Sequence, residues 1–121
     1  MVDYRKYKVW EKSHDFALQV YQLTKSFPDS EKFNLIAQLR RAATSIPTNI
    51  SEGAGRETNK EFVRFLYIAS GSAHESHYLL FLSKELGYAN QDAIQECLQL
   101  AEEIKKMLAA LIRKIKSSSN F

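Results

Sequence analysis

The sequence QLRRAATSIPTNISEGAGR, residues 38–56, has the composition of an α-helix and carries a proline, Pro47, in its middle. A proline inside a helix removes one backbone hydrogen bond and contacts the preceding turn, at a cost of roughly 3 kcal/mol. The apolar residues Leu39, Ile46 and Ile50 keep helical spacing across Pro47. This favours a kinked helix over one that ends at the proline. We therefore predict one helix kinked at Pro47.

The kink should lie between Ala43 and Pro47. Pro47 donates no backbone hydrogen bond, so one carbonyl in the preceding turn loses its donor. We expect the hydroxyl of Thr44 or Ser45 to lie near that carbonyl. Gly53 and Gly55 should then end the helix.

Three further segments have apolar residues at helical spacing. The four expected helices cover residues 9–27, residues 31–54, the segment from a cap at Thr58 to a stop at Gly87, and the segment from a cap at Asn90 to about residue 116. Thr58 is followed three residues later by a glutamate, which makes a capping box. The sequence has no strand alternation and no glycine-rich phosphate loop. Short connections therefore predict an all-α, antiparallel up-down-up-down four-helix bundle.

The 121 residues are enough for one domain, with residues 1–8 as an N-terminal arm and residues 117–121 as a frayed tail. The hydrophobic content of 45% and the charged content of 26% are typical of a soluble globular protein. A single cysteine, Cys97, forms no internal disulfide. The longest apolar run, residues 78–82, is far shorter than a membrane span, and residues 1–12 lack the apolar core of a secretory signal. We expect a cytoplasmic protein.

Four stretches in order carry a family resemblance: VWEK (9–12), residues 38–56, EFVRFLYIASGSAHE (61–75) and KELGY (84–88). With them the chain resembles, over nearly its whole length, the four-helix bundle family of proteins encoded in 23S rRNA intervening sequences. The most specific part comprises Arg40, Arg41, Ser45, Ile46, Pro47, Asn49, Ile50, Glu52, Gly53, Gly55 and Arg56. Within it, we take Pro47, Asn49, Glu52 and Gly53 as the structural signature.

The resemblance implies homopentamers of antiparallel four-helix bundles without catalytic activity. A related protein, the accessory variability determinant of diversity-generating retroelements, is a basic pentamer that binds nucleic acid and a reverse transcriptase. The resemblance therefore gives structured RNA, another nucleic acid or a protein such as a reverse transcriptase as candidate partners.

Two groups of basic residues are candidates for nucleic-acid contacts. The first surrounds the signature and comprises Arg40, Arg41, Arg56, Lys60 and Arg64. Glutamates lie among these cations, so a salt-bridge network is as good an interpretation as a phosphate-binding patch. The second group comprises Lys105, Lys106 and Arg113, followed by Lys114 and Lys116, and its alternative is a solvated helix face. Tyr4 and Tyr7 in the arm are candidates for stacking on bases.

The net charge is +3 and the isoelectric point is about 9.0, which is compatible with an anionic partner. Five chains would carry 5 × 3 = +15, and a weak patch repeated in this way becomes multivalent.

Residue types that carry catalysis or bind metals occur without the required partners. Glu11 and His14 make one Glu-x-x-His pair, but a di-metal bundle needs a second pair, and the sequence has none. His74 and His77 could bind zinc only with a third group, and a polar helix face or subunit contact explains them as well. Cys97 lies on an apolar stripe as an inert core thiol. We therefore expect no enzyme activity, metal or cofactor.

Two hypotheses follow. The first is a non-enzymatic, homo-oligomeric bundle that binds structured RNA through its basic surface. The alternative is a protein–protein adaptor or assembly scaffold without nucleic-acid binding.

Overall fold

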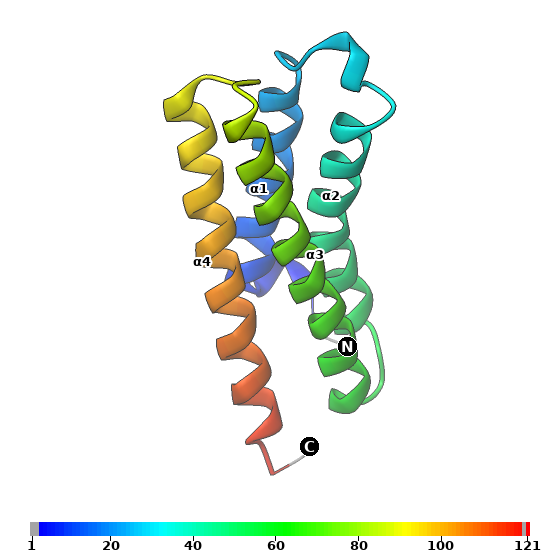
Figure 1. Ribbon diagram of the computed structural model, residues 1–121. Coiled ribbons are helices and arrows are strands. Elements are labelled where there is room, and N and C mark those ends of the chain that lie inside the picture. The colour runs from blue at the N-terminus through cyan, green and yellow to red at the C-terminus, as the bar shows by residue number, and fades with distance from the viewer. Residues whose placement is uncertain (1–2, 120) are drawn as a thin grey trace.

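A computed structural model describes residues 3–119 and 121 of the chain. The described residues form the helices α1 (Lys8–Thr24), α2 (Leu35–Ala54), α3 (Asn59–Glu85) and α4 (Gln91–Lys116), with short 3-10 helices η1 (Tyr4–Lys6) and η2 (Asp29–Glu31). Helices α1 and α3 each pack against both α2 and α4. The predicted all-α four-helix bundle is confirmed (Figure 1).

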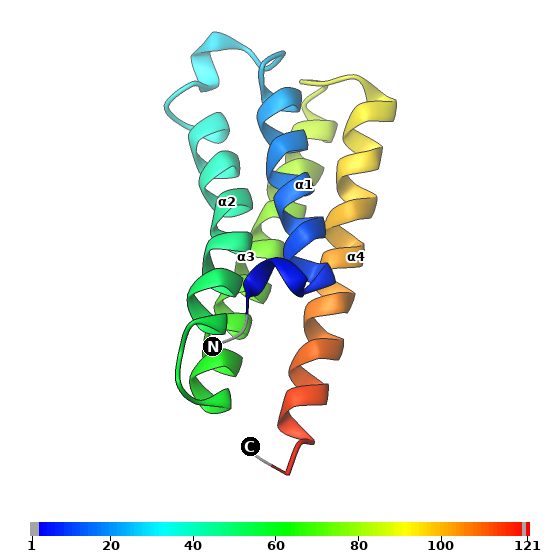
Figure 2. The same ribbon diagram turned by 180° about the vertical axis from the view of Figure 1, so that it is seen from behind.

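The connections between helices lie at alternating ends of the bundle. Those between α1 and α2 and between α3 and α4 lie at one end, and the α2–α3 connection lies at the other (Figures 1 and 2). The last turns of α4 extend at the end that carries the α2–α3 connection (Figure 1). None of the helices in the described residues has the length and apolarity to cross a membrane.

One continuous apolar core joins the four helices. Each helix contributes side chains that are fully buried, among them Phe16, Val20, Leu39, Ile46, Ile50, Leu66, Leu80, Ile94, Ile104 and Leu108. Burying a side chain of this kind stabilises a fold by roughly 1.5–3 kcal/mol. The helical spacing of these residues in the sequence is therefore the main reason that the four segments form helices that pack together.

Helix α2 continues through Pro47 and reaches Ala54. Pro47 leaves one backbone carbonyl of the preceding turn without a donor. The two hydroxyl groups expected near that carbonyl form hydrogen bonds with other groups. Thr44 Oγ1 donates to the Arg40 carbonyl at 2.9 Å, because a threonine in a helix reaches back to the carbonyl four residues before it. Ser45 Oγ accepts a hydrogen bond from Asn49 Nδ2 at 2.9 Å. The kink itself stays a prediction.

Helices α2 and α3 approach each other closely at Gly53. A Cβ atom on Gly53 would lie 2.7 Å from the Cβ of Phe65 and 2.8 Å from Cδ1 of Phe62. Atoms of this kind do not approach so closely in folded proteins, so the position needs a residue without a side chain. Gly53 therefore has a packing role beyond ending a helix.

The predicted helix ends after α2 are confirmed. The Thr58 side chain accepts from the Glu61 backbone N–H at 3.2 Å at the start of α3. The Asn90 side chain likewise accepts from the backbone N–H groups of Asp92 and Ala93 at the start of α4. Gly87 follows α3 with a φ of 72°, a left-handed conformation that glycine adopts without strain.

The boundary between the first two helices differs from the prediction. Helix α1 ends at Thr24 rather than near residue 27, and α2 begins at Leu35 rather than residue 31. The chain leaves the helix so that Phe27 can bury its ring in the core. Residues 29–31 then form η2 as a separate turn. Neither N-cap residue, Pro28 of η2 nor Asn34 of α2, makes a side-chain cap bond. We attribute the shifted boundary to the burial of Phe27.

Tyr88 and Glu31 join the two connections at one end of the bundle. The Tyr88 hydroxyl donates to Glu31 Oε2 at 2.9 Å, although the two residues are 57 positions apart. This bond raises the pKa of Tyr88 above its usual range, because the adjacent carboxylate disfavours the phenolate. The Tyr88 ring also lies 5.7 Å from that of Phe27. We call this pair of contacts the Tyr88 clasp.

The N-terminal arm packs on the bundle. The rings of Tyr4 and Trp10 lie 4.9 Å apart, and those of Tyr7 and Phe62 lie 5.4 Å apart. Both tyrosines, expected to stack on bases, are thus used in contacts within the chain. The arm and the tail are described except for residues 1, 2 and 120, which lie outside the described residues.

Candidate nucleic-acid interface

The structure divides the eight candidate cations by what they contact. Arg40 and Lys105 are partly buried and bonded within the chain. The other six are exposed, namely Arg41, Arg56, Lys60, Arg64, Lys106 and Arg113. Within residues 3–119 and 121, no ion pair includes any of these six side chains. The salt-bridge network considered for the first group is therefore not found among these residues.

Arg40 stabilises the end of α1. Its Nε donates to Thr24 Oγ1 at 2.9 Å, and its Nη2 donates to the carbonyl of Tyr21 at 3.3 Å. The guanidinium carbon lies 4.5 Å from the centre of the Tyr21 ring. A positive charge beside the last carbonyls of a helix also suits the helix dipole. Of the two adjacent arginines, Arg40 has a structural role, whereas Arg41 is exposed.

Lys105 belongs to a polar cluster between α3 and α4. Its Nζ lies 3.2 Å from Glu102 Oε2, and His77 Nε2 lies 3.4 Å from the same oxygen. The hydrogen bond from Lys105 lowers the pKa of Glu102 below its usual range. Lys105 therefore has a structural contact that Lys106 and Arg113 lack among the described residues. These two residues lie seven positions apart on one exposed face of α4.

The first group also does not form one patch. Arg41 lies on α2, which occupies the diagonal position from α4 in the bundle. Arg56 follows α2, and its guanidinium carbon lies 4.9 Å from the centre of the Phe65 ring. Lys60 and Arg64 lie one turn apart near the start of α3. Both side chains are exposed, at the end of the bundle where α4 finishes.

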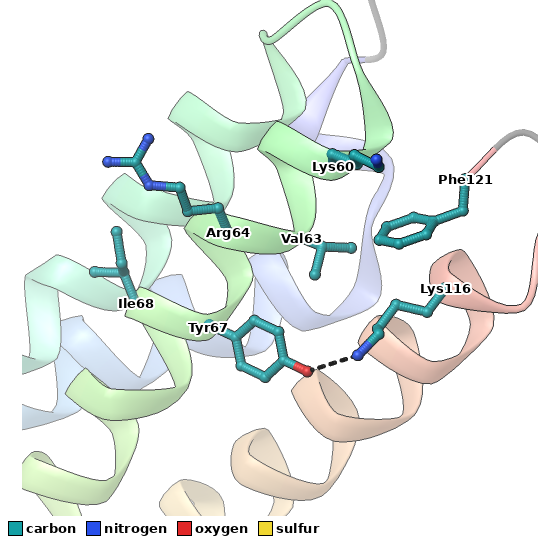
Figure 3. Close-up of a pocket in the computed structure, with 7 residues that line it drawn as sticks. All are labelled: Lys60, Val63, Arg64, Tyr67, Ile68, Lys116 and Phe121. Carbon is teal, nitrogen blue, oxygen red and sulfur yellow. Dashed lines mark hydrogen bonds between the residues drawn. The ribbon is translucent and has the colours of Figure 1, made fainter.

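There they line a shallow, open hollow of about 630 Å³ between α3 and α4. Its lining side chains are Lys60, Val63, Arg64, Tyr67, Ile68, Lys116 and Phe121. We call this the α3–α4 hollow (Figure 3). Three of these side chains are cations, four are apolar or aromatic, and none is a carboxylate. A surface of this composition favours an anion that also has an apolar face.

Tyr67 and Lys116 join the two helices that line the hollow. Lys116 Nζ donates to the Tyr67 hydroxyl at 3.3 Å, which links α4 to α3. Figure 3 shows Phe121 and Val63 on this side of α3, whereas Arg64 and Ile68 point to its other side. The lining cations thus lie on both sides of α3, with Lys60 and Lys116 on the Phe121 side and Arg64 on the other.

Sequence reasoning missed Tyr67 and Phe121, and it grouped Lys116 with the basic residues of α4 rather than with Lys60 and Arg64. The available signal was the spacing of Lys60, Arg64 and Tyr67, because residues three, four or seven apart share one helix face. Lys116 and Phe121 approach that face only in the folded chain.

The other signature residues have structural positions. Asn49 Nδ2 donates to the carbonyl of Ser45 at 2.8 Å, and Ser72 Oγ donates to Ser45 Oγ at 2.9 Å. The first bond lies within α2, and the second joins α3 to α2. Pro47 is partly buried in α2, and Glu52 is exposed.

The candidate metal ligands and nucleophiles have other contacts. His74 Nδ1 lies 2.8 Å from the Ser70 carbonyl, and His14 stacks on Trp10 with ring centres 5.1 Å apart. In the part of the chain that the structure describes, no three His, Cys, Asp or Glu side chains are grouped to hold a metal. Burial raises the pKa of the Cys97 thiol to about 11, so little thiolate forms near neutral pH.

Comparison with protein families matches residues 5–110 to the model described as 23S rRNA-intervening sequence protein. The chain belongs to this family. A solved structure from Bacteroides thetaiotaomicron VPI-5482, described as a protein with unknown function from the S23 ribosomal protein family, is 30% identical. The similarity covers 87% of this chain and 95% of the Bacteroides chain, with a TM-score of 0.79. Comparison with curated proteins found no match. The family resemblance noted in the sequence is therefore confirmed.

Proposed function

We propose that this member of the 23S rRNA-intervening sequence protein family is a non-enzymatic homo-oligomer that binds structured RNA by contacts to phosphates. The observation that carries the proposal is the α3–α4 hollow, whose lining includes Lys60, Arg64 and Lys116 and no carboxylate side chain. Such cations bind phosphates and release the counterions that surround a nucleic acid. Arg56, Lys106 and Arg113 add further exposed positive charge outside the hollow.

Two further facts support RNA as the partner. The net charge of +3 per chain is repeated in every subunit of an assembly, so that weak contacts act together. The family name refers to 23S rRNA, and the Bacteroides protein is described as a member of a ribosomal protein family. No element of the chain is a recognised module for reading base sequence, so we expect recognition of the backbone and shape of RNA.

RNA affinity should therefore fall steeply as the salt concentration rises. If one hollow neutralises three phosphates, affinity should drop roughly 40-fold between about 50 and 200 mM salt. Fluorescence anisotropy with a labelled RNA hairpin measures this. A triple variant, K60E/R64E/K116E, should lose most of the binding at low salt. Variant K106E/R113E tests the outer face of α4 in the same assay.

The matched control is K25E/K32E/K84E, which makes the same change in net charge near the opposite end of the bundle. This control should bind RNA more tightly than the hollow variant. Equal losses in the two triple variants would show that net charge, and not the hollow, determines binding. If the parent protein binds no RNA at low salt, the scaffold hypothesis is favoured.

Self-association has its own supporting observation. Tyr78 and Phe81 on α3 have exposed fractions of 59% and 47%, and they lie next to each other on the outer helix face. Exposed groups of large apolar side chains commonly mark contacts with another chain. We therefore propose that this part of α3 contacts a second subunit.

Light scattering should give the mass of a pentamer, 5 × 13.9 = 69.5 kDa. The double variant Y78D/F81D should shift the mass toward the 13.9 kDa monomer, because a buried unpaired carboxylate destabilises an interface. Circular dichroism checks that the helices persist. A monomeric parent protein would contradict the assembly, and an unchanged mass in the double variant would exclude this face.

A further inference from the structure

We infer that the α3–α4 hollow binds one unpaired nucleotide, with the base on the Tyr67 ring and the adjoining phosphates between Lys60, Lys116 and Arg64. This inference rests on the proposed RNA binding and names the part of the RNA that the hollow recognises. It is carried by an exposed aromatic side chain set among cations.

The apolar part of the hollow suits a base. Tyr67 is 52% exposed, and its ring lies on the side of α3 that faces Val63 and Phe121 (Figure 3). The hydrogen bond from Lys116 to the Tyr67 hydroxyl restrains the ring at its edge. A restrained ring with an accessible face loses little freedom when a base stacks on it. Any base can stack in this way, because every base has an aromatic face.

The cations lie where the backbone of such a nucleotide would run. Lys60 and Lys116 come from different helices on the Phe121 side of the hollow, and Arg64 points to the other side of α3 (Figure 3). A strand that crosses α3 with its base on Tyr67 therefore meets a positive charge before and after the base. The volume of about 630 Å³ is within the usual range for sites of small ligands.

Base pairing decides which RNA fits. Inside a duplex the faces of a base are covered by its neighbours, and the grooves of an A-form helix do not present those faces to a protein. A duplex can therefore use the cations of the hollow but not Tyr67. A loop, bulge or single strand can use both.

This site is separable from the proposed subunit contact. Tyr78 lies eleven residues beyond Tyr67, which is roughly 16 Å along α3. Substitution at Tyr67 therefore tests the hollow without changing Tyr78 or Phe81.

The experiment compares a short unstructured RNA of about a dozen nucleotides with a blunt-ended duplex of the same sequence. Tyr67→Leu keeps an apolar side chain without the ring, and Tyr67→Phe keeps the ring without the hydroxyl. Tyr67→Leu should weaken binding of the single strand by roughly 5- to 150-fold and change duplex binding by less than about twofold. Tyr67→Phe should bind the single strand nearly as the parent does.

A second readout reports stacking directly. A single strand that contains 2-aminopurine should lose fluorescence on binding the parent or Tyr67→Phe, but not on binding Tyr67→Leu at saturation. If Tyr67→Leu weakens both RNAs equally or neither, while K60E/R64E/K116E still loses binding, the inference is overturned and the proposed function stands. If the parent binds neither RNA at low salt, the proposed function fails and the inference fails with it.

Discussion

Substitution of Gly53 by alanine should destabilise the protein by about 1–3 kcal/mol, because the core at this point has no room for a methyl group. Helix propensity alone predicts the opposite, since alanine favours a helix over glycine by about 1 kcal/mol. The new Cβ would lie 2.7 Å from the Phe65 Cβ, which is fixed to the backbone of α3. Relief of this overlap requires α2 and α3 to move apart. This movement would loosen the packing of the side chains between the two helices.

The matched control is Gly71→Ala in α3. Gly71 is also helical, but it is exposed. Apart from its chain neighbours and the nearby backbone of α3, no atom of the described residues lies within 4 Å of the position of its Cβ. This variant should be stabilised by about 0.5–1 kcal/mol. Urea unfolding followed by circular dichroism measures both changes. All samples have the same protein concentration, so that the proposed self-association affects them equally. Shifts in the same direction for the two variants would contradict the close approach of α2 and α3 at Gly53.

Substitution of Arg40 by alanine should destabilise the protein by about 1–3 kcal/mol. The variant loses charge-assisted bonds to Thr24 Oγ1 and to the Tyr21 carbonyl, and it exposes the ring on which the guanidinium packs. Thr24 is almost fully buried, so solvent replaces the lost bond poorly.

Arg41→Ala provides the comparison, since it removes the same side chain from the next residue. Arg41 is exposed, and its loss should change the free energy of unfolding by less than about 0.5 kcal/mol. The same urea experiment separates the two variants. Equal and small effects would show that the contacts of Arg40 at the end of α1 contribute little to stability.

The fold was predictable because its signals are local. The apolar spacing identifies four helices, and the caps at Thr58 and Asn90 bind the backbone N–H groups that their sequence context predicts. The start of α2 was not predictable in this way. Local preference at residues 29–31 favours the start of a helix, but burial of Phe27 and the bond from Tyr88 to Glu31 depend on the whole fold. Tertiary contacts of this kind override a propensity worth a few tenths of a kcal/mol.

The candidate site was predictable only in part, for a similar reason. Lys60 and Arg64 are correctly placed on an exposed surface, because they lie off the apolar stripe of α3. The sequence shows that Arg40 and Arg41 point in different directions, but not which of the two meets α1. Lys116 comes near Tyr67 only because α4 packs against α3, and no spacing within one helix contains that information.

The Tyr88 clasp gives the two ends of the bundle different freedom to open. At one end, a hydrogen bond and a ring contact hold both connections together. The other end has one connection, and α4 finishes there with its last turn beside the hollow. Hydrogen exchange by local opening should therefore be faster in the last turn of α4 than near Tyr88. A strand of RNA that bridges Lys60 and Lys116 should slow this exchange, because it would tie the last turn of α4 to the start of α3.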